Sequence, residues 1–474
     1  MIFNSLTFIV FFVVVYAGYR LLPGWGARKN LLLVSSYVFY GAWNPPFALL
    51  LLLSTVIDWW LAGRMSRESV ESRRRLWLTI SLVANFSCLG FFKYGNFLLE
   101  NTTAVLSALG ISYHPPHLDI LLPVGISFYT FHTLSYTIDV YRRQMLPAKS
   151  LRDFALFVSF FPQLVAGPIV RARDFLYQLD APPAPVRGRF SWGLSLMTLG
   201  LFQKMVIADT LLAPSADAVF GHAFPLAALD AWAGSLAFGM QIFFDFSGYT
   251  LCAIGIDLCF GFYLIDNFKF PYGASGFSDF WRRWHISLSS WLRDYLYIPL
   301  GGNRLGSFRT CVNIMVVMLL GGLWHGAAWT FVAWGALHGL FLLAERGVHA
   351  MTGKAAWTSS APAATLGWLL TFLGVTVTWV FFRAQDFPTA MKTLASMAGV
   401  FGEKGDQILA TRDLLGVFAV VLVVLSIHRL MRNSSLEALV QRAPRWAVAV
   451  VWIIMSLAIL LTQGTGNAFI YFQF

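Results

Sequence analysis

The chain has 474 residues, of which 57% are hydrophobic and only 12% are charged. Soluble domains carry roughly 25% charged residues, so this composition excludes a disordered chain and argues against an ordinary soluble enzyme. The net charge of +11 is explained by basic cytoplasmic loops of a membrane protein rather than by nucleic acid binding. Long uninterrupted apolar runs favour membrane helices over a β-barrel, whose strands alternate apolar and polar residues.

The first part of the chain predicts helices whose connections alternate in charge. The apolar runs are 2–22, 30–43, 46–62, 76–98 and 121–140. The first run has no basic residue before it, so we expect a spanning helix rather than a cleaved signal peptide. Lys and Arg are present in the first, third and fifth connections and absent from 44–46 and 100–120. Basic loops stay in the cytoplasm, which places the N-terminus outside, in the periplasm.

Residues 153–170 are predicted to form a re-entrant hairpin. If this run crossed the membrane, the arginines after it would lie outside, and the loop 210–230, which has no Lys or Arg, would lie inside. Both placements oppose the charge rule. Pro162, Gly167 and Pro168 interrupt the run. Irregular backbone at membrane depth must be sheltered by protein or water. A kinked helix is the alternative.

The second part of the chain is expected to cross the membrane several more times. The predicted spans are 191–208, 231–265, 364–382, 413–428 and 446–463. Residues 231–265 are too many for one straight crossing, and Gly248 can bend them. The basic residues of 266–309 place that segment in the cytoplasm. The orientation after residue 383 is left open, because basic residues then fall in an outer loop.

His325 is the strongest candidate for a catalytic residue. It lies in L-G-G-L-W-H-G, inside the run 314–344, which contains no Asp, Glu, Lys or Arg. A helix over 311–324 covers only ~20 Å, so His325 is predicted to lie deep in the membrane. Ionisable groups at that depth are costly and typically functional. A neutral imidazole there is suited to act as a general base.

The other histidines give weaker signals. On one continuous helix, His338 would lie on nearly the opposite face from His325 and ~20 Å away, so it is predicted to be structural. His132 is predicted to be a hydrogen-bonded core histidine, with a cavity residue as the alternative. Positions in loops or at helix ends are predicted for His114, His117, His222, His349 and His428.

Residues 277–297 predict an amphipathic helix lying in the cytoplasmic interface. Large apolar side chains recur there at helical spacing: Trp281, Trp284, Leu288, Trp291, Leu292 and Tyr295. The intervening arginines would meet lipid headgroups or an anionic ligand. His285 lies within this segment, and the pattern alone leaves open whether it is structural or functional.

Two carboxylates and four cysteines lie in apolar runs. Asp245 is predicted to bond to a neighbouring helix or to position a catalytic histidine, and Asp58 is predicted to be interfacial. The cysteines form no C-x-x-C pair and are predicted to be core residues rather than metal ligands or disulfides. They are Cys88, Cys252, Cys259 and Cys311.

Several stretches resemble the membrane-bound O-acyltransferase family. They are F-D-F-S-G-Y (244–249), the run 279–302, G-G-L-W-H-G (321–326) and W-G-A-L-H-G (334–339). The core of the resemblance is 241–345, and it extends more weakly over most of the chain. It implies one integral-membrane domain over 1–474, all-α, with a ring of about 11 tilted transmembrane helices and re-entrant segments around a central tunnel.

The family resemblance also implies a site and an activity. The membrane-embedded histidine of the family matches His325, and its second polar position matches His285. The bacterial branch that includes the alginate O-acetylases implies acetyl transfer from a cytoplasmic thioester, expected to be acetyl-CoA, for O-acetylation of an exopolysaccharide such as alginate. It further implies the bacterial inner membrane and a periplasmic acetyltransferase partner. His325 would deprotonate the acceptor hydroxyl, and His285 would orient the donor or stabilise the oxyanion.

Other functions remain open at this stage. The sequence contains no CoA-binding fingerprint, P-loop or metal-ligand cluster, and Thr250-Leu251-Cys252 follows F-S-G-Y where the alginate enzyme carries an acid. Cellulose or peptidoglycan O-acetylation and teichoic acid D-alanylation are therefore alternatives. A polysaccharide-precursor transporter is the non-enzyme alternative, because broken helices and intramembrane polar groups also suit transporters. The lack of a repeat relating the two halves argues against it.

Overall fold

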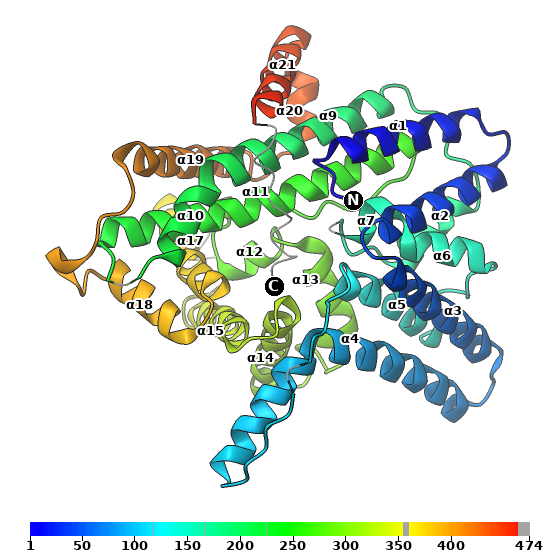
Figure 1. The fold of residues 1–474 in the computed structure, drawn as a ribbon, viewed down its shortest axis with the longest axis horizontal. Coiled ribbons are helices and arrows are strands. Elements are labelled where there is room, and N and C mark those ends of the chain that lie inside the picture. The colour runs from blue at the N-terminus through cyan, green and yellow to red at the C-terminus, as the bar shows by residue number, and fades with distance from the viewer. Residues whose placement is uncertain (117, 166, 224, 354–359, 463–474) are drawn as a thin grey trace. The chain divides into compact units, whose positions relative to one another are not determined.

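A computed structural model describes the whole chain except residues 117, 166, 224, 354–359 and 463–474. The loop position predicted for His117 therefore lies outside the described residues. Helices dominate the described part (Figure 1), where the β structure is a single isolated bridge between Leu226 and Asp406. The prediction of an all-α fold is confirmed.

Seven helices in the described residues are long and apolar enough to cross a membrane. They are α3 (Pro45–Arg67), α4 (Glu71–Ala108), the helix Arg189–Gly221, α11 (Ala228–Phe260), α14 (Gly306–His325), α17 (Ala361–Arg383) and α19 (Thr411–Leu430). Two shorter apolar helices are α1 (Leu6–Leu21) and α21 (Arg445–Leu461). The chain is thus a polytopic membrane protein, but the expected count of about 11 spans is not confirmed.

The chain divides into two compact units. One comprises Met1–Met197 and Cys252–Ile265, and the other comprises Thr198–Leu251 and Asp266–Phe474, of which the last twelve residues are not described. The helix α11 contributes residues to both units. The single domain over 1–474 stays a prediction.

The first unit holds the N-terminal helices, blue to teal in Figure 1. Besides α1, α3 and α4, these are α2 (Trp25–Gly41), α5 (Ile126–Tyr141), α6 (Leu151–Ser159), α7 (Phe161–Leu164), α8 (Ala172–Phe175), the 3₁₀ turn η1 (Leu176–Leu179) and the start of α9 (Arg189–Leu201). The nine residues of α6 rise ~14 Å, less than half of a bilayer core. The chain breaks at Phe160, which is fully buried. The predicted interruption of 153–170 is confirmed, and protein shelters it.

Asp58 is fully buried, so the prediction of an interfacial carboxylate is wrong. On α4, the Ser81 hydroxyl donates to Asp58 Oδ1 at 2.6 Å and the Asn85 amide donates to Oδ2 at 2.9 Å. Thr133 on α5 donates to Asn85 Oδ1 at 3.1 Å. The carboxylate can be buried because α4 supplies hydrogen-bond donors for it, one of which is held in place by α5.

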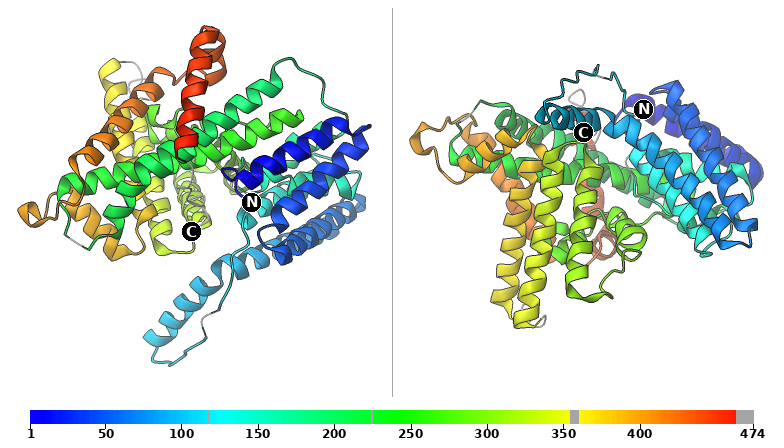
Figure 2. Two further views of the ribbon diagram at one scale, coloured as in Figure 1. Left: turned by 45° about the horizontal axis from the view of Figure 1, so that its top comes forward. Right: turned by 90° about the horizontal axis from the view of Figure 1, so that it is seen from below.

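The second unit contains His285, His325 and His338 and the helices around them. After α9 come the π-helical η2 (Phe202–Leu212), α10 (Ala213–Gly221) and α11, then the 3₁₀ turn η3 (Pro271–Gly273), α12 (Phe277–Trp281), α13 (Ile286–Leu292), the π-helical η4 (Arg293–Tyr297), α14, α15 (Trp329–Thr352), α17, α18 (Phe387–Met397), η5 (Gly402–Lys404), α19, α20 (Leu436–Arg442) and α21. Figure 2 shows α14, α15 and α17 side by side.

The helix α11 runs unbroken from Ala228 to Phe260, so the predicted bend at Gly248 is wrong. The glycine instead allows a close helix contact. A Cβ atom on Gly248 would lie 2.6 Å from the carbonyl oxygen of Gly200, which real Cβ atoms do not tolerate. The missing side chain therefore lets η2 and the preceding turn approach α11.

The prediction of one helix over 277–297 is also wrong, and its place in the interface stays a prediction. The chain leaves the helix after α12 and re-enters it at α13, with His285 in the left-handed region at φ +44°. Trp284 is 1% exposed and Trp291 is 6% exposed. These indoles pack in the protein core rather than at the lipid surface. The break is secured by a backbone bond from the Lys269 N–H to the Arg283 carbonyl, 2.9 Å long.

Truncating Trp284 is expected to destabilise the fold. Its indole packs against Phe243, Phe280 and Trp379, with ring centroids 6.2, 5.6 and 5.1 Å away. Trp284→Ala should cost about 3–5 kcal/mol, as large-to-small core changes do. The fraction of monodisperse protein after detergent extraction, and its melting temperature, measure this. Trp446→Ala, at an indole that is 71% exposed, is the control; equal stability of the two variants would contradict the packing described.

Candidate active site

His325 lies at the C-terminal end of α14, where the helix stops. Its ring is 4% exposed and packs edge-on against Trp334 and Phe382, with centroids 5.1 and 5.3 Å away. Gly326 follows in an extended conformation, and a Cβ atom there would collide with the Phe331 ring. The glycine thus permits the chain to turn directly after His325 and to start α15 four residues after it.

His285 precedes α13 and is fully buried. Its Nδ1 lies 3.1 Å from Oδ1 of Asn267. The edge of its ring meets Phe246 of α11 at a centroid distance of 4.7 Å. Complete burial lowers the pKa of the His285 imidazole below its ordinary value, because desolvation disfavours the charged form. The ring is therefore neutral at physiological pH.

The two imidazoles predicted as site residues are neighbours. Their ring centroids lie 6.3 Å apart, and Trp324 packs against both, 6.0 Å from His285 and 5.0 Å from His325. A direct N–H···N bond of about 3 Å would bring the centroids to about 5.5 Å or less. The rings are thus adjacent without bonding to each other, a spacing that suits a shared substrate group. Their catalytic roles stay predictions.

His338 lies on α15, across Trp334 from His325. The Trp334 ring contacts His338 at 4.7 Å and His325 at 5.1 Å between centroids. His338 Nε2 and the Thr378 hydroxyl are hydrogen-bonded at 3.0 Å. The prediction that His338 would lie ~20 Å from His325 assumed one continuous helix between them. That assumption is wrong, because α14 ends at His325 and the chain turns at Gly326 before α15. The position of His338 fits a residue that packs behind the Trp334 indole.

Asp245 forms a buried ion pair with Lys204. Lys204 Nζ lies 2.5 Å from Asp245 Oδ1 and 2.7 Å from Asp209 Oδ1. All three side chains are at most 3% exposed. The first predicted role of Asp245, bonding to a neighbouring helix, is confirmed. Lys204 was not predicted as a partner, although a lysine in the apolar run 191–208 is a visible signal.

A second polar cluster surrounds Asp279 in α12. Arg283 Nε and Arg432 lie 3.0 and 2.7 Å from its carboxylate. Burial opposes ionisation, but these two guanidinium groups hold the pKa of Asp279 below its ordinary value. The cluster borders a cavity of about 690 Å³, whose lining also includes Arg282 and Arg346.

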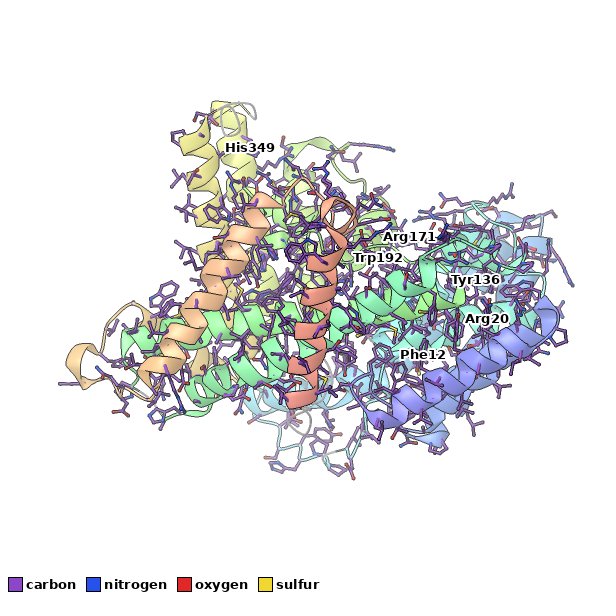
Figure 3. The ribbon with its side chains drawn as sticks, turned by 90° about the horizontal axis from the view of Figure 1, so that it is seen from above. Phe12, Arg20, Tyr136, Arg171, Trp192 and His349 are labelled. Atoms are coloured by element: carbon purple, nitrogen blue, oxygen red, sulfur yellow. The ribbon has the colours of Figure 1, made fainter. Side chains whose placement is uncertain are left out.

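The same cavity reaches the end of α15. Figure 3 shows His349 at that end of the molecule, and it is among the lining residues. Ser307 and Cys311 from the first turns of α14 line it too. The cavity thus lies at the opposite end of α14 from His325. Arginine side chains around it make it suitable for an anionic group.

The remaining histidines occupy different environments. His428 lies in the last turn of α19, so its predicted helix-end position is confirmed, but it is not solvated: it is 5% exposed, stacks on Tyr272 and accepts a hydrogen bond from the Tyr272 N–H at 3.2 Å. His222 is more exposed and pairs with Asp406 at 3.1 Å. His132 is fully buried in α5. The four cysteines are free thiols, and the described residues contain no cluster suited to a metal ion.

Comparison with known proteins identifies the fold family. The model of the MBOAT, or membrane-bound O-acyltransferase, family matches residues 78–383. This chain belongs to the membrane-bound O-acyltransferase family. The matched region contains both His285 and His325, and the chain is accordingly an O-acyltransferase. The transporter alternative is thereby set aside.

Three similar proteins are named for the transfer of an acetyl or D-alanyl group to a polymer. "Probable alginate O-acetylase" of Azotobacter vinelandii is 43% identical over 399 residues, covering 84% of this chain and 78% of that protein. Peptidoglycan O-acetyltransferase of Helicobacter pylori is 39% identical, covering 85% and 80%. Teichoic acid D-alanyltransferase of Bacillus subtilis is 26% identical, covering 58% and 72%.

Removing the Asp279 carboxylate should reduce stability in a pH-dependent way. The lowered pKa of Asp279 means that its contribution is fully present above the ordinary carboxyl pKa of about 3.9 and is lost as pH falls through the lower folded value. Asp279→Asn should therefore melt at a lower temperature than the parent from pH 8 down to about 5, with the gap closing below about pH 4. Asp413→Asn, at an exposed site, is the control. A gap that widens in acid would contradict the ion-pair interpretation.

Proposed function

We propose that this acyltransferase moves an acetyl group from a cytoplasmic thioester, acetyl-CoA, for the O-acetylation of an exopolysaccharide such as alginate. The observation that carries the proposal is the pair of buried imidazoles, His285 and His325, with centroids 6.3 Å apart. The acetyl group is supported by the names of two relatives, a probable alginate O-acetylase and a peptidoglycan O-acetyltransferase. The alternatives are O-acetylation of peptidoglycan or cellulose, which changes the acceptor, and D-alanylation of teichoic acid, which changes both the acceptor and the transferred group.

The reaction needs a proton acceptor and a hydrogen-bond donor at one carbonyl. The oxygen of the acceptor hydroxyl attacks the thioester carbon, and its proton passes to a neutral imidazole. The carbonyl oxygen becomes negative and must be stabilised by a donor. The C–S bond then breaks, and the leaving thiolate takes the proton from the imidazolium. Two neighbouring imidazoles supply both tasks, with His325 as the base and His285 at the oxyanion, or the reverse.

The walls of the site keep this chemistry away from water. Trp324, Trp334 and Phe382 surround His325, and none of their side chains is substantially exposed. A dry site strengthens electrostatic interactions and prevents hydrolysis of the thioester. An acyltransferase requires that protection, because water competes with the acceptor hydroxyl.

The arginine-lined cavity suits the nucleotide part of the donor. Cys311 lies at its edge, and fourteen residues of α14 separate Cys311 from His325, a rise of ~21 Å. Phosphates bound near Arg282 and Arg346 would leave the thioester on its extended arm directed along α14 towards His325. The basic residues of this segment favour the cytoplasmic side of the bacterial inner membrane. The acetyl group would then pass to a periplasmic acetyltransferase partner and on to the polysaccharide.

His325→Ala is expected to abolish transfer without unfolding the protein. Loss of a general acid or base typically costs ~10²–10⁴-fold in rate, and removing a polar group at depth does not harm membrane insertion. The measurement is transfer or hydrolysis of the labelled acetyl group of acetyl-CoA by purified, monodisperse protein. His222→Ala, at a partly exposed histidine, is the matched control and should retain activity. Near-normal rates in folded His325→Ala would overturn the proposed chemistry.

The orientation predicted from loop charge can be tested separately. Single cysteines at Leu109 and Arg73, both exposed side chains, are introduced after replacing the four native cysteines. With the N-terminus in the periplasm, an impermeant maleimide added to intact cells should label position 109 and not position 73. Labelling at 73 in intact cells, with none at 109, would show the opposite orientation.

A further inference from the structure

Asn267 joins the turn that carries His285 to α11. The residue is 1% exposed. Its carbonyl oxygen accepts a hydrogen bond from the Ile286 N–H at 2.9 Å. Its side-chain oxygen Oδ1 lies 2.9 Å from the Ser287 hydroxyl, 3.2 Å from the Ser287 N–H and 3.1 Å from His285 Nδ1. One buried amide thus contacts three groups of the same turn.

The orientation of this amide is fixed by its partners. A backbone N–H can only donate, so the Asn267 atom that faces the Ser287 N–H must be the oxygen. The amide nitrogen then points to the Thr250 hydroxyl on α11, 3.5 Å away. Exchanging the two atoms would set an NH₂ group against a backbone N–H in a buried place, which is costly.

The fixed oxygen determines which nitrogen of His285 carries the proton. An unprotonated Nδ1 would turn its lone pair towards Asn267 Oδ1 at 3.1 Å. The Ser287 hydroxyl is 3.4 Å from Nδ1, but it donates to Oδ1 at the shorter distance of 2.9 Å, so Nδ1 carries a hydrogen and donates it. In a neutral imidazole the other nitrogen, Nε2, is then unprotonated. Nε2 is buried and has no hydrogen-bond partner among the residues that the structure describes. It is an acceptor without a donor in this structure.

The backbone at His285 indicates that the ring position is enforced. A non-glycine residue at φ +44° and ψ +55° is uncommon, and such conformations persist only where the surroundings impose them. The Ile286 and Ser287 bonds to Asn267 supply that constraint on one side. On the other side the ring packs against Phe246, Trp324 and His325. Of the rings packed on it in the described structure, only that of His325 is titratable.

We propose that Asn267 is a positioning residue that holds His285 in the Nδ1–H tautomer, and that His285 Nε2 takes the proton of the acceptor hydroxyl. The inference rests on the proposed acyl transfer and assigns its two tasks. As the O–C bond forms, the hydroxyl proton moves to Nε2, and as the C–S bond breaks, the thiolate sulfur takes that proton back. Asn267 Oδ1 stabilises the imidazolium in between. A bare Nε2 cannot stabilise an oxyanion, so the donor at the carbonyl oxygen is His325, the reverse of the order expected from the sequence.

Kinetics of Asn267 variants test the positioning role. Asn267→Leu removes the acceptor and should lower kcat by ~10²–10⁴-fold with little change in KM for acetyl-CoA. Asn267→Asp keeps an acceptor of the same shape and should restore most of kcat. Its carboxylate raises the pKa of His285, which must be neutral to act, so the acidic limb of the pH profile should move to higher pH. Asn313→Leu removes an equally buried amide that bonds to backbone carbonyls of 300 and 302; it should lower stability but leave kcat and the pH limb of the folded protein unchanged.

A spectroscopic measurement separates this inference from the proposed function. The ¹⁵N chemical shifts of histidine-labelled full-length protein distinguish protonated from bare ring nitrogens, and the signals missing in His285→Gln identify His285. We expect a bare Nε2 in the parent and in Asn313→Leu, and mixed tautomers in Asn267→Leu. A bare Nδ1 in the parent, or an unchanged tautomer in Asn267→Leu, would overturn the positioning role. If folded Asn267→Leu shows mixed tautomers of His285 but an unchanged kcat, the assignment of His285 as base is overturned. The expected tautomer in a protein that transfers no acetyl group would refute the proposed function alone.

Discussion

The close approach of α14 and α15 is the constraint on which the site depends. Gly322 and Gly335 face each other across this helix pair, and a Cβ atom on either would meet backbone of the other helix. Because the helices touch without side chains between them, the chain can turn within three residues after His325. The turn places Trp334 against the His325 ring. A helix pair held further apart by larger side chains would not bring this indole to the imidazole.

Several buried polar groups outside the site are held by partners within the fold. Asp58 accepts from Ser81 and Asn85, and Lys204 lies between Asp209 and Asp245. Such groups would be costly in a bilayer without partners. His285 differs, because only one of its nitrogens is bonded within the described structure. An unfilled acceptor beside a second imidazole is suited to bind a substrate hydroxyl.

Hydrophobic patterning was sufficient to predict the helical membrane fold and the interruption of 153–170, since long apolar runs and loop charges depend little on tertiary context. It failed at 277–297, where regular spacing of Trp284, Leu288 and Trp291 predicted one helix. The break there depends on His285 adopting a left-handed conformation, which Asn267 enforces from eighteen residues away. Periodicity carries no information about such a contact. The bend predicted at Gly248 failed for a related reason, because sequence does not tell whether a glycine kinks a helix or admits a neighbour.

The pairing of two neutral imidazoles is well suited to acyl transfer at membrane depth. The hydroxyl and the thioester are both uncharged, and so are the products, an ester and a thiol. A permanent charge in the site would add a desolvation cost throughout the cycle. An imidazolium that forms only while the bonds rearrange is stabilised by the opposite charge of the oxyanion beside it. The Asn267 amide fits this requirement, since it orients His285 as a carboxylate would but without adding a charge. The buried carboxylates Asp245 and Asp279 form ion pairs with Lys204 and with Arg283.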